Sequence, residues 1–236
     1  MVKLSNSGIG LSGEGFAGCA GSPLHLSVEE HFRGRSRSPA RLAGTVLLAG
    51  GIRSKGFRAI LGRNILDLPV DRERRILDLW QEQIASLSDH FGWRELRSKV
   101  LIDSGASAPQ FRGSANVNHY LAIERDGRAF RGTGGVLRDA CRGIDANDYI
   151  LVCNAFQILY KPLTRLVERL LDASADLSFT KEPCGGAGSV FLIRGGCLTA
   201  IPEVGFVDFK EQAISLIARS HRVRVVEASE RSALPV

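Results

Sequence analysis

The chain has 236 residues, which allows one large domain or two small ones. Hydrophobic residues make up 44% and charged residues 24%, which excludes collagen-like, coiled-coil and wholly disordered proteins. No apolar run approaches about 18 residues, so a membrane-spanning helix is excluded and no membrane partner is expected. The net charge of +6 suits an anionic ligand but does not by itself make a surface for nucleic acid.

The five cysteines are odd in number, and no two of them are spaced as Cys-x-x-Cys. Neither a disulfide framework nor a zinc knuckle is therefore predicted. A reduced, cytoplasmic setting is the plain interpretation. The histidines are scattered and show no metal-ligand spacing, so we interpret each of them as structural or exposed.

Residues 1–40 are rich in Gly and Ser and show no helical or strand period. We interpret them as a flexible extension, with the ordered domain at 41–236; a start codon assigned upstream of the true domain is the alternative. The Arg-Ser run at 33–38 raises nucleic-acid binding as a further class of function. No aromatic stacking residues stand beside that run, so nucleic acid is not an expected partner.

The first predicted element is Thr45–Ala49, a short apolar run typical of a buried parallel strand, which ends at Gly50-Gly51. Residues 72–91 have a helical period, and Asp71 is placed to cap the start of that helix. The apolar face of this helix is made by Leu77, Trp80, Ile84, Leu87 and Phe91. Short strands are predicted at 100–102 and 119–124.

The second half continues the alternation, with a strong buried strand at 149–153 and a helix that begins near Pro162. Further helices are predicted at 135–141 and 209–219, and further strands at 177–180, 190–193 and 223–227. Alternating strands and helices predict an α/β layer fold with a mainly parallel central sheet. Ligands of such sheets bind beyond the carboxyl ends of the strands.

The first glycine-rich turn follows the first strand, where Gly50 and Gly51 lead into a basic stretch that contains Arg53 and Lys55. Glycine lets the backbone approach a ligand closely and present N–H donors to phosphate, and the two basic side chains could neutralise a phosphate chain. The turn is neither a Walker loop nor a dinucleotide fingerprint. A plain turn is the alternative.

The second glycine-rich turn, Gly132-Thr133-Gly134-Gly135, precedes a predicted helix. Free N–H groups at a helix N-terminus favour an anion or a polar base edge. The alternative is tight packing of the helix on the sheet together with a Thr cap.

Five segments in one order resemble the sugar-phosphate nucleotidyltransferases, also called nucleotide-sugar pyrophosphorylases. The resemblance spans about residues 45–227 and rests on the glycine turn after the first strand, the Gly-Thr turn and three later segments. Those later segments are Ile150-Leu151-Val152-Cys153-Asn154, Ala187-Gly188-Ser189-Val190-Phe191-Leu192-Ile193 and Pro202–Gln212.

The resemblance implies a Rossmann-like three-layer fold and transfer of a nucleotidyl group from a nucleoside triphosphate to a sugar 1-phosphate, with release of pyrophosphate. It implies Mg²⁺ as the cofactor, and a nucleoside triphosphate and a sugar phosphate as partners; a homo-oligomer is compatible with it. Lys55 and Arg53 would be catalytic. The nucleotide would be bound by Ala49, Gly50, Gly51, Gly132, Thr133 and Asn154.

The sequence departs from the family where metal binding is concerned. The family's Asn-Gly-Asp becomes Asn154-Ala155-Phe156, and Lys55 stands at the position of the catalytic Arg, where it keeps the charge but loses the planar fork. Asp103 and Asp208 are the candidates for rebuilding a metal site, since Asp148 precedes its strand and so lies at the wrong end. A solvated or capping carboxylate is the alternative for each.

The chain also ends soon after the strand at 223–227, where the family continues with a closing segment, and we expect the usual C-terminal segment to be lacking. Two functions remain open. The first is nucleotidyl transfer to a sugar 1-phosphate; the second is a catalytically inactive module of the same fold that binds a nucleotide or nucleotide sugar.

Overall fold

The computed structural model describes the chain from Arg41 onward, and the described residues belong to one compact unit, Pro39–Val236. The predicted extension at 1–40 lies outside them, as do Gly51, Arg53 and Lys55. The described residues are 41–50, 59–60, 62–93, 96–111, 121–127, 130–159, 161–181, 187–227 and 233–235.

The centre of the unit is a 7-stranded sheet with the strand order β3-β2-β1-β4-β7-β6-β8. Within this sheet β7 alone runs antiparallel to its neighbours, and the other pairings are parallel. A short antiparallel pair, β5 with β9, forms a second sheet. The bounds are β1 Leu42–Leu48, β2 Arg97–Asp103, β3 Leu121–Asp126, β4 Tyr149–Asn154, β5 Gln157–Leu159, β6 Leu177–Lys181, β7 Ala187–Arg194, β8 Val223–Glu227 and β9 Ala233–Pro235.

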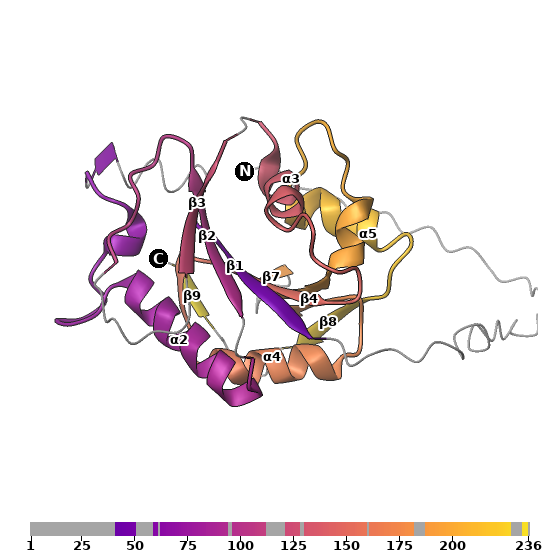
Figure 1. Ribbon diagram of the computed structural model, residues 1–236, viewed down its shortest axis with the longest axis horizontal. Helices are drawn as coiled ribbons and strands as arrows, with labels where there is room; N and C mark the ends of the chain where they lie inside the picture. Colours follow the sequence, from indigo (N-terminus) through magenta and orange to yellow (C-terminus); the bar gives the residue numbers. More distant parts are fainter. Residues whose placement is uncertain are drawn as a thin grey trace, which may run out of the picture. The chain divides into compact units, whose positions relative to one another are not determined.

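Helices cover both faces of the large sheet, which makes the fold an α/β fold of three layers (Figure 1). One face carries α2 (Ile76–Phe91) and α4 (Leu163–Asp172), and the other carries α3 (Gly132–Ala140), η3 (Phe209–Ala213) and α5 (Ile214–Ile217). Short turns of helix, η1 (Ile65–Asp67) and η2 (Gly195–Ala200), complete the described elements. The fold class predicted from the sequence is confirmed.

Each face of the sheet has its own core because successive side chains of a strand point to opposite faces. Leu47 of β1 and Cys153 of β4 pack in the core beneath α2 and α4, whereas Val46 and Val152 pack in the core beneath α3 and α5. The central strand β4 is buried along its whole hydrophobic run, as expected for a parallel strand covered on both sides.

Helix α2 shows both the strength and the limit of the sequence pattern. Its predicted apolar face is confirmed, with Leu77, Trp80, Ile84 and Leu87 buried. The prediction that Asp71 caps it is wrong, since the helix begins at Ile76 and its N-cap is Arg75. The Asp71 carboxylate instead accepts the backbone N–H of Glu73 at 2.9 Å and of Arg74 at 2.7 Å, which closes a separate turn.

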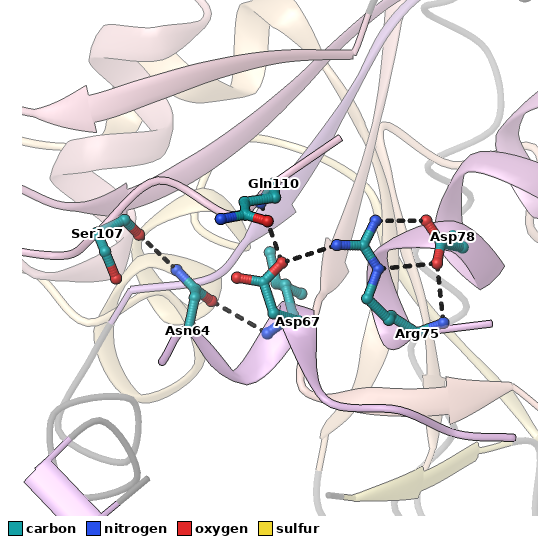
Figure 2. A network of polar contacts seen from close by, with 7 residues as sticks. Asn64, Asp67, Arg75, Asp78, Ser107 and Gln110 are labelled. Carbon is teal, nitrogen blue, oxygen red and sulfur yellow. Dashed lines mark hydrogen bonds and ion pairs between the residues drawn. The ribbon is translucent and has the colours of Figure 1, made fainter. Parts of the chain in front are cut away.

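A buried ion network holds the start of α2 against the loops that follow β1 and β2 (Figure 2). The guanidinium of Arg75 donates to Asp78 from Nε at 3.0 Å and from Nη2 at 2.9 Å, and it reaches Asp67 of η1 at 3.2 Å. Asp67 also accepts the backbone N–H of Gln110 at 3.0 Å. The Asn64 amide donates to the Ser107 carbonyl at 2.9 Å, so the two loops are joined at two points.

Replacing Arg75 with leucine should therefore lower the free energy of unfolding by about 2 kcal/mol, because it leaves two largely buried carboxylates without their cation. Urea denaturation measures this change. Arg74→Leu is the matched control, since Arg74 makes exposed ion pairs with Asp71 and Glu82, which solvent screens, and its loss should leave the midpoint of denaturation almost unchanged. Equal losses in the two variants would contradict the assignment of the network.

Candidate functional site

The candidate site lies at the edge of the large sheet where the parallel strands end, which we call the carboxyl edge. Strand β1 has β2 on one side and β4 on the other, so the chain changes direction across the sheet at β1. In open α/β sheets a ligand binds beyond the carboxyl ends of the strands at such a switch point. Residues that follow β1, β2 and β4 are therefore the first to consider.

The segment after β1 passes directly over the end of β2. The Ala49 N–H donates to the Leu101 carbonyl at 2.8 Å, which keeps the chain beside β2 one residue beyond its own strand. A Cβ placed on Gly50 would lie 2.9 Å from Oδ1 of Asp103. The structure thus places Gly50, the described residue of the first predicted turn, beside the candidate metal ligand Asp103, whose carboxylate is the end of a flexible side chain.

The end of β4 meets the end of β1 beside this turn. The Ala155 N–H donates to the Leu48 carbonyl at 3.0 Å, and the Trp80 indole donates to the Ala155 carbonyl at 3.1 Å. Asn154 is half-buried, and its Oδ1 accepts the Phe156 N–H at 2.9 Å, which closes a tight turn. Asn154 is therefore rigidly placed at the switch point.

Phe156 stands where the resemblance would require a metal-binding Asp. Its side chain is 9% exposed and packs in the core beneath α2 and α4. An apolar residue in the core supplies no ligand for a cation. The position has become part of the packing of the domain.

The second predicted turn is packed against the segment that precedes η3. Gly132 has φ +69°, and a Cβ there would lie 2.4 Å from the Val207 carbonyl oxygen. The Gly134 N–H donates to that carbonyl at 2.9 Å, and the Val207 N–H donates to the Arg131 carbonyl at 2.9 Å. Close packing accounts for Gly132 and Gly134, but against the segment before η3 and not against the sheet as predicted. The predicted Thr cap is not observed, since the N-cap of α3 is Arg131. The predicted start of the helix, at 135, shifts to Gly132.

Thr133 and Asp208 join the two helices that begin here. The Thr133 hydroxyl donates to Oδ2 of Asp208 at 3.1 Å and accepts the Phe209 N–H at 2.8 Å. Oδ1 of Asp208 accepts the N–H groups of Lys210 at 2.9 Å and Glu211 at 3.0 Å, so Asp208 caps η3. Asp208 thus has the capping role that was the alternative to a metal-binding one, and its role toward a metal stays a prediction.

Among the residues that the structure describes, no group of three or more His, Cys, Asp or Glu side chains is placed to hold a metal ion. Asp148 lies at the opposite edge, as expected, and pairs with Arg41 at 2.8 Å. Of the carboxylates considered from the sequence, Asp103 is the one that lies beside Gly50 at this edge.

Lys210 is a residue that the sequence pattern did not single out. Its Nζ donates to the carbonyl of Ala187, the first residue of β7, at 2.9 Å, and it lies 5.9 Å from the centre of the Phe191 ring. Because β7 is antiparallel, its start lies at the carboxyl edge. The sequence could have pointed to Lys210, because this residue belongs to the segment Pro202–Gln212 that resembles the family.

A cluster of arginines around Asp139 anchors α3. Asp139 pairs with Arg131, with Arg138 at 3.0 Å and with Arg142 at 3.4 Å. Burial raises the pKa of Asp139, but the hydrogen bond from Arg138 and the charges of Arg131 and Arg138 outweigh that effect, so its pKa lies below the ordinary value.

The lowered pKa of Asp139 predicts a dependence of stability on pH. A carboxyl whose pKa is lower in the folded state stabilises the fold above its unfolded pKa, which is about 3.9, and this stabilisation is lost as the pH falls through the folded pKa. Asp139→Asn should lower the free energy of unfolding by about 1–2 kcal/mol at pH 7. The difference from the unmodified chain should shrink below about pH 4. Thermal unfolding at several pH values measures it, and a constant difference would contradict the prediction.

The described cysteines are poor nucleophiles. Burial raises the pKa of the Cys141 and Cys197 thiols to about 12 and raises that of Cys153 further still. Each thiol therefore stays protonated at neutral pH, and covalent chemistry through these three residues is not supported.

A pocket of about 580 Å³ lies at the opposite edge of the sheet, where β1, β2 and β4 begin. Two of the cations that line it are paired within the protein, Arg41 with Asp148 and Lys99 with Glu124 at 2.9 Å. Because ligands of open α/β sheets bind beyond the carboxyl ends of the strands, the carboxyl edge is favoured over this pocket as the place for a nucleotide.

Two solved structures share this fold at low sequence identity. One, described as a glucose-1-phosphate thymidylyltransferase from Bacillus anthracis and solved with sucrose, has a TM-score of 0.56 at 13% identity and covers 80% of this chain and 87% of its own. The other, Rv0371c from Mycobacterium tuberculosis H37Rv, has a TM-score of 0.51 at 16% identity and covers 84% of this chain and 94% of its own. No protein-family model and no curated protein matches the sequence.

These likenesses establish the class of fold, a three-layer α/β fold like that of nucleotidyltransferases. The activity of the neighbours is not carried over with the fold. None of the helices in the described part of the chain has the length and apolar character that crossing a bilayer requires.

Proposed function

We propose that the chain transfers a nucleotidyl group from a nucleoside triphosphate to a sugar 1-phosphate and releases pyrophosphate. One observation carries the proposal: the segment after β1, the end of β2 and the end of β4 meet at the switch point of a nucleotidyltransferase-like sheet. The sequence motifs that resemble the family fall on these same segments, with Gly50 after β1 and Asn154 at the end of β4.

The proposed roles follow from position. Backbone N–H groups of Gly50 and Gly51 would hold the triphosphate, and Arg53 and Lys55 would neutralise its charge. Ala49, predicted as a third nucleotide-binding residue, already uses its N–H on the Leu101 carbonyl and would only set the position of the turn. Asn154 would orient the nucleotide through its amide nitrogen, because its oxygen already accepts a bond from Phe156.

The Gly-Thr turn would lie against the base or ribose. The Thr133 hydroxyl is held by Asp208 and Phe209, so the turn would offer backbone groups of Gly132 and Thr133 as contacts. A turn that is already rigid loses little conformational entropy when the ligand binds.

One carboxylate, that of Asp103, would hold Mg²⁺ beside the Gly50 turn. This ion is commonly held by one or two carboxylates together with substrate phosphates, and Asp103 lies beside the Gly50 turn where the phosphates are expected. When bound, the ion would neutralise charge on the transferring phosphoryl group. Asp103 would supply the protein ligand, whereas the buried Phe156 supplies none.

In the proposed reaction a phosphate oxygen of the sugar 1-phosphate attacks the α-phosphorus, and the new P–O bond forms as the bond to the bridging oxygen breaks. Pyrophosphate leaves with the bonding electron pair, so no proton or redox partner is required. The protein aligns the two substrates and stabilises negative charge through Lys55 and Arg53.

A catalytically inactive module that binds a nucleotide or nucleotide sugar is the second candidate. The burial of Phe156 in the core favours it, because metal stabilisation of phosphoryl charge is worth several kcal/mol and its loss costs about a thousandfold in rate.

One assay separates the two candidates. The purified chain is incubated with Mg²⁺, each of the common nucleoside triphosphates and a panel of sugar 1-phosphates, and pyrophosphate release is measured alongside nucleotide binding by calorimetry. Turnover supports the enzyme. Nucleotide binding without turnover supports the inactive module, and the absence of both overturns the proposal.

A further inference from the structure

Phe130, two residues before Gly132, combines two unfavourable features. Its backbone has φ +61°, in the left-handed region that L side chains rarely adopt, and its side chain is 89% exposed. A large residue at positive φ is strained, and an exposed aromatic ring gains nothing from the core. Neither local propensity nor packing accounts for phenylalanine at this position, which suggests a role in contacting a ligand.

A second exposed ring lies on the segment that pairs with this one. Phe206 is 61% exposed and precedes Val207, whose N–H donates to the Arg131 carbonyl at 2.9 Å. Phe130 precedes Arg131 in the same way. Each phenylalanine therefore precedes one partner of the same backbone hydrogen bond, which brings two segments that are far apart in the sequence next to each other.

The loop that carries Phe206 is fixed at both ends. At one end the buried Arg138 guanidinium donates to the carbonyls of Ile201 at 3.3 Å, of Glu203 at 3.1 Å and of Pro202. At the other end the Val207 carbonyl accepts the Gly134 N–H at 2.9 Å. A ring on a loop held in this way loses little conformational freedom when a ligand packs on it.

Both rings belong to the carboxyl edge. Lys99, near the start of β2, donates to the carbonyl of Ala140 at 3.0 Å, so the C-terminal end of α3 lies toward the opposite edge and its N-terminal end lies toward the carboxyl edge. Phe130 immediately precedes that N-terminal end. The rings therefore border the turn at which the base or ribose is expected.

We propose that Phe130 and Phe206 form a stacking platform for the nucleobase. This inference rests on the proposed function and adds the residues that bind the base. Every base has a flat π-face that stacks on an aromatic ring, so the platform would add affinity for nucleotides in general and discriminate little between bases. Purines, with the larger face, should bind somewhat more tightly than pyrimidines.

The test compares nucleoside triphosphates with inorganic triphosphate, which has the same charged groups but no base. Phe130→Gly should weaken binding of ATP or UTP about tenfold and leave the affinity for inorganic triphosphate unchanged. The same substitution should raise the melting temperature, because glycine adopts positive φ without strain. Lower affinity in a more stable protein would separate a binding role from a structural one.

Further variants define the platform. Phe206→Ala should also weaken nucleotide binding about tenfold, whereas Phe130→Trp should preserve it. Val204→Ala is the matched control, since Val204 is 87% exposed on the same loop but has no ring, and it should not change the affinity.

The outcomes keep the two proposals apart. Binding of nucleotides by the unmodified chain with no loss in either phenylalanine variant overturns the platform and leaves the proposed function intact. Altered self-association of Phe206→Ala in sedimentation, with unchanged nucleotide affinity, also overturns it in favour of an interface between copies. If neither nucleotides nor inorganic triphosphate bind the unmodified chain, both proposals fail.

Discussion

Lys55→Ala should reduce the rate of pyrophosphate release by about a thousandfold. In phosphoryl-transfer enzymes, a cationic side chain that stabilises charge in the transition state raises kcat by about a thousandfold or more. The side chain is assigned by its place after Gly50-Gly51 in the sequence. Its loss should act mainly on kcat, since charge on the phosphoryl oxygens develops furthest in the transition state. Steady-state pyrophosphate release measures the effect.

Two further variants sharpen this expectation. Lys55→Arg keeps the positive charge and adds a planar fork that can bond two phosphate oxygens at once, so it should keep or raise the turnover. Arg165→Ala removes a mostly exposed cation on α4, which covers the sheet's face away from α3, and should leave turnover unchanged. If Lys55→Ala retains full activity, the phosphate site must be sought elsewhere in the chain.

The arrangement of layers follows from patterns that the sequence shows directly. A run such as Tyr149–Cys153 is apolar at every position because β4 is covered on both faces, and no other element of that length fits it. The face of α2 could be predicted because the spacing from Leu77 to Leu87 repeats every three to four residues. Hydrophobic periodicity depends on local geometry alone, which is why it transfers from sequence to structure.

Helix ends were less predictable because several residues compete for the same backbone groups. Asp71 is a good N-cap by type, yet it closes a turn of its own, and Arg75 begins the helix through a buried ion network. The partners of Arg75 include Asp67, eight residues earlier in the chain, and no local rule identifies that pairing.

The candidate site was predictable in outline but not in its internal bonding. The sequence placed Gly50 and Asn154 at strand ends, and the structure confirms those places, whereas Thr133, expected in the turn before α3, lies in its first turn. No sequence pattern indicates that Thr133 bonds to Asp208, 75 residues away, or that Phe156 is buried. Such contacts depend on how distant segments pack, which a single sequence does not encode in any short pattern.

Gly132→Ala should lower the free energy of unfolding by about 3 kcal/mol, for two reasons that add. The positive φ of Gly132 costs any L residue about 1–2 kcal/mol. The new Cβ would also lie 2.4 Å from the Val207 carbonyl oxygen, a backbone atom that cannot rotate aside, and forced displacement in a packed site costs about 1–3 kcal/mol. Urea denaturation measures the sum.

Gly143→Ala separates these two contributions. Gly143 has φ +84°, and no atom lies within 4 Å of the position that a Cβ would take, so the variant should show the conformational cost alone, about 1 kcal/mol. The remaining difference of about 2 kcal/mol would belong to the contact with Val207. That contact also sets the position of Phe206, the next residue back along the chain, so Gly132→Ala should weaken nucleotide binding whereas Gly143→Ala should not. Equal losses of stability in the two variants would show that the loop before η3 yields easily, and a rigid platform for the base would then be untenable.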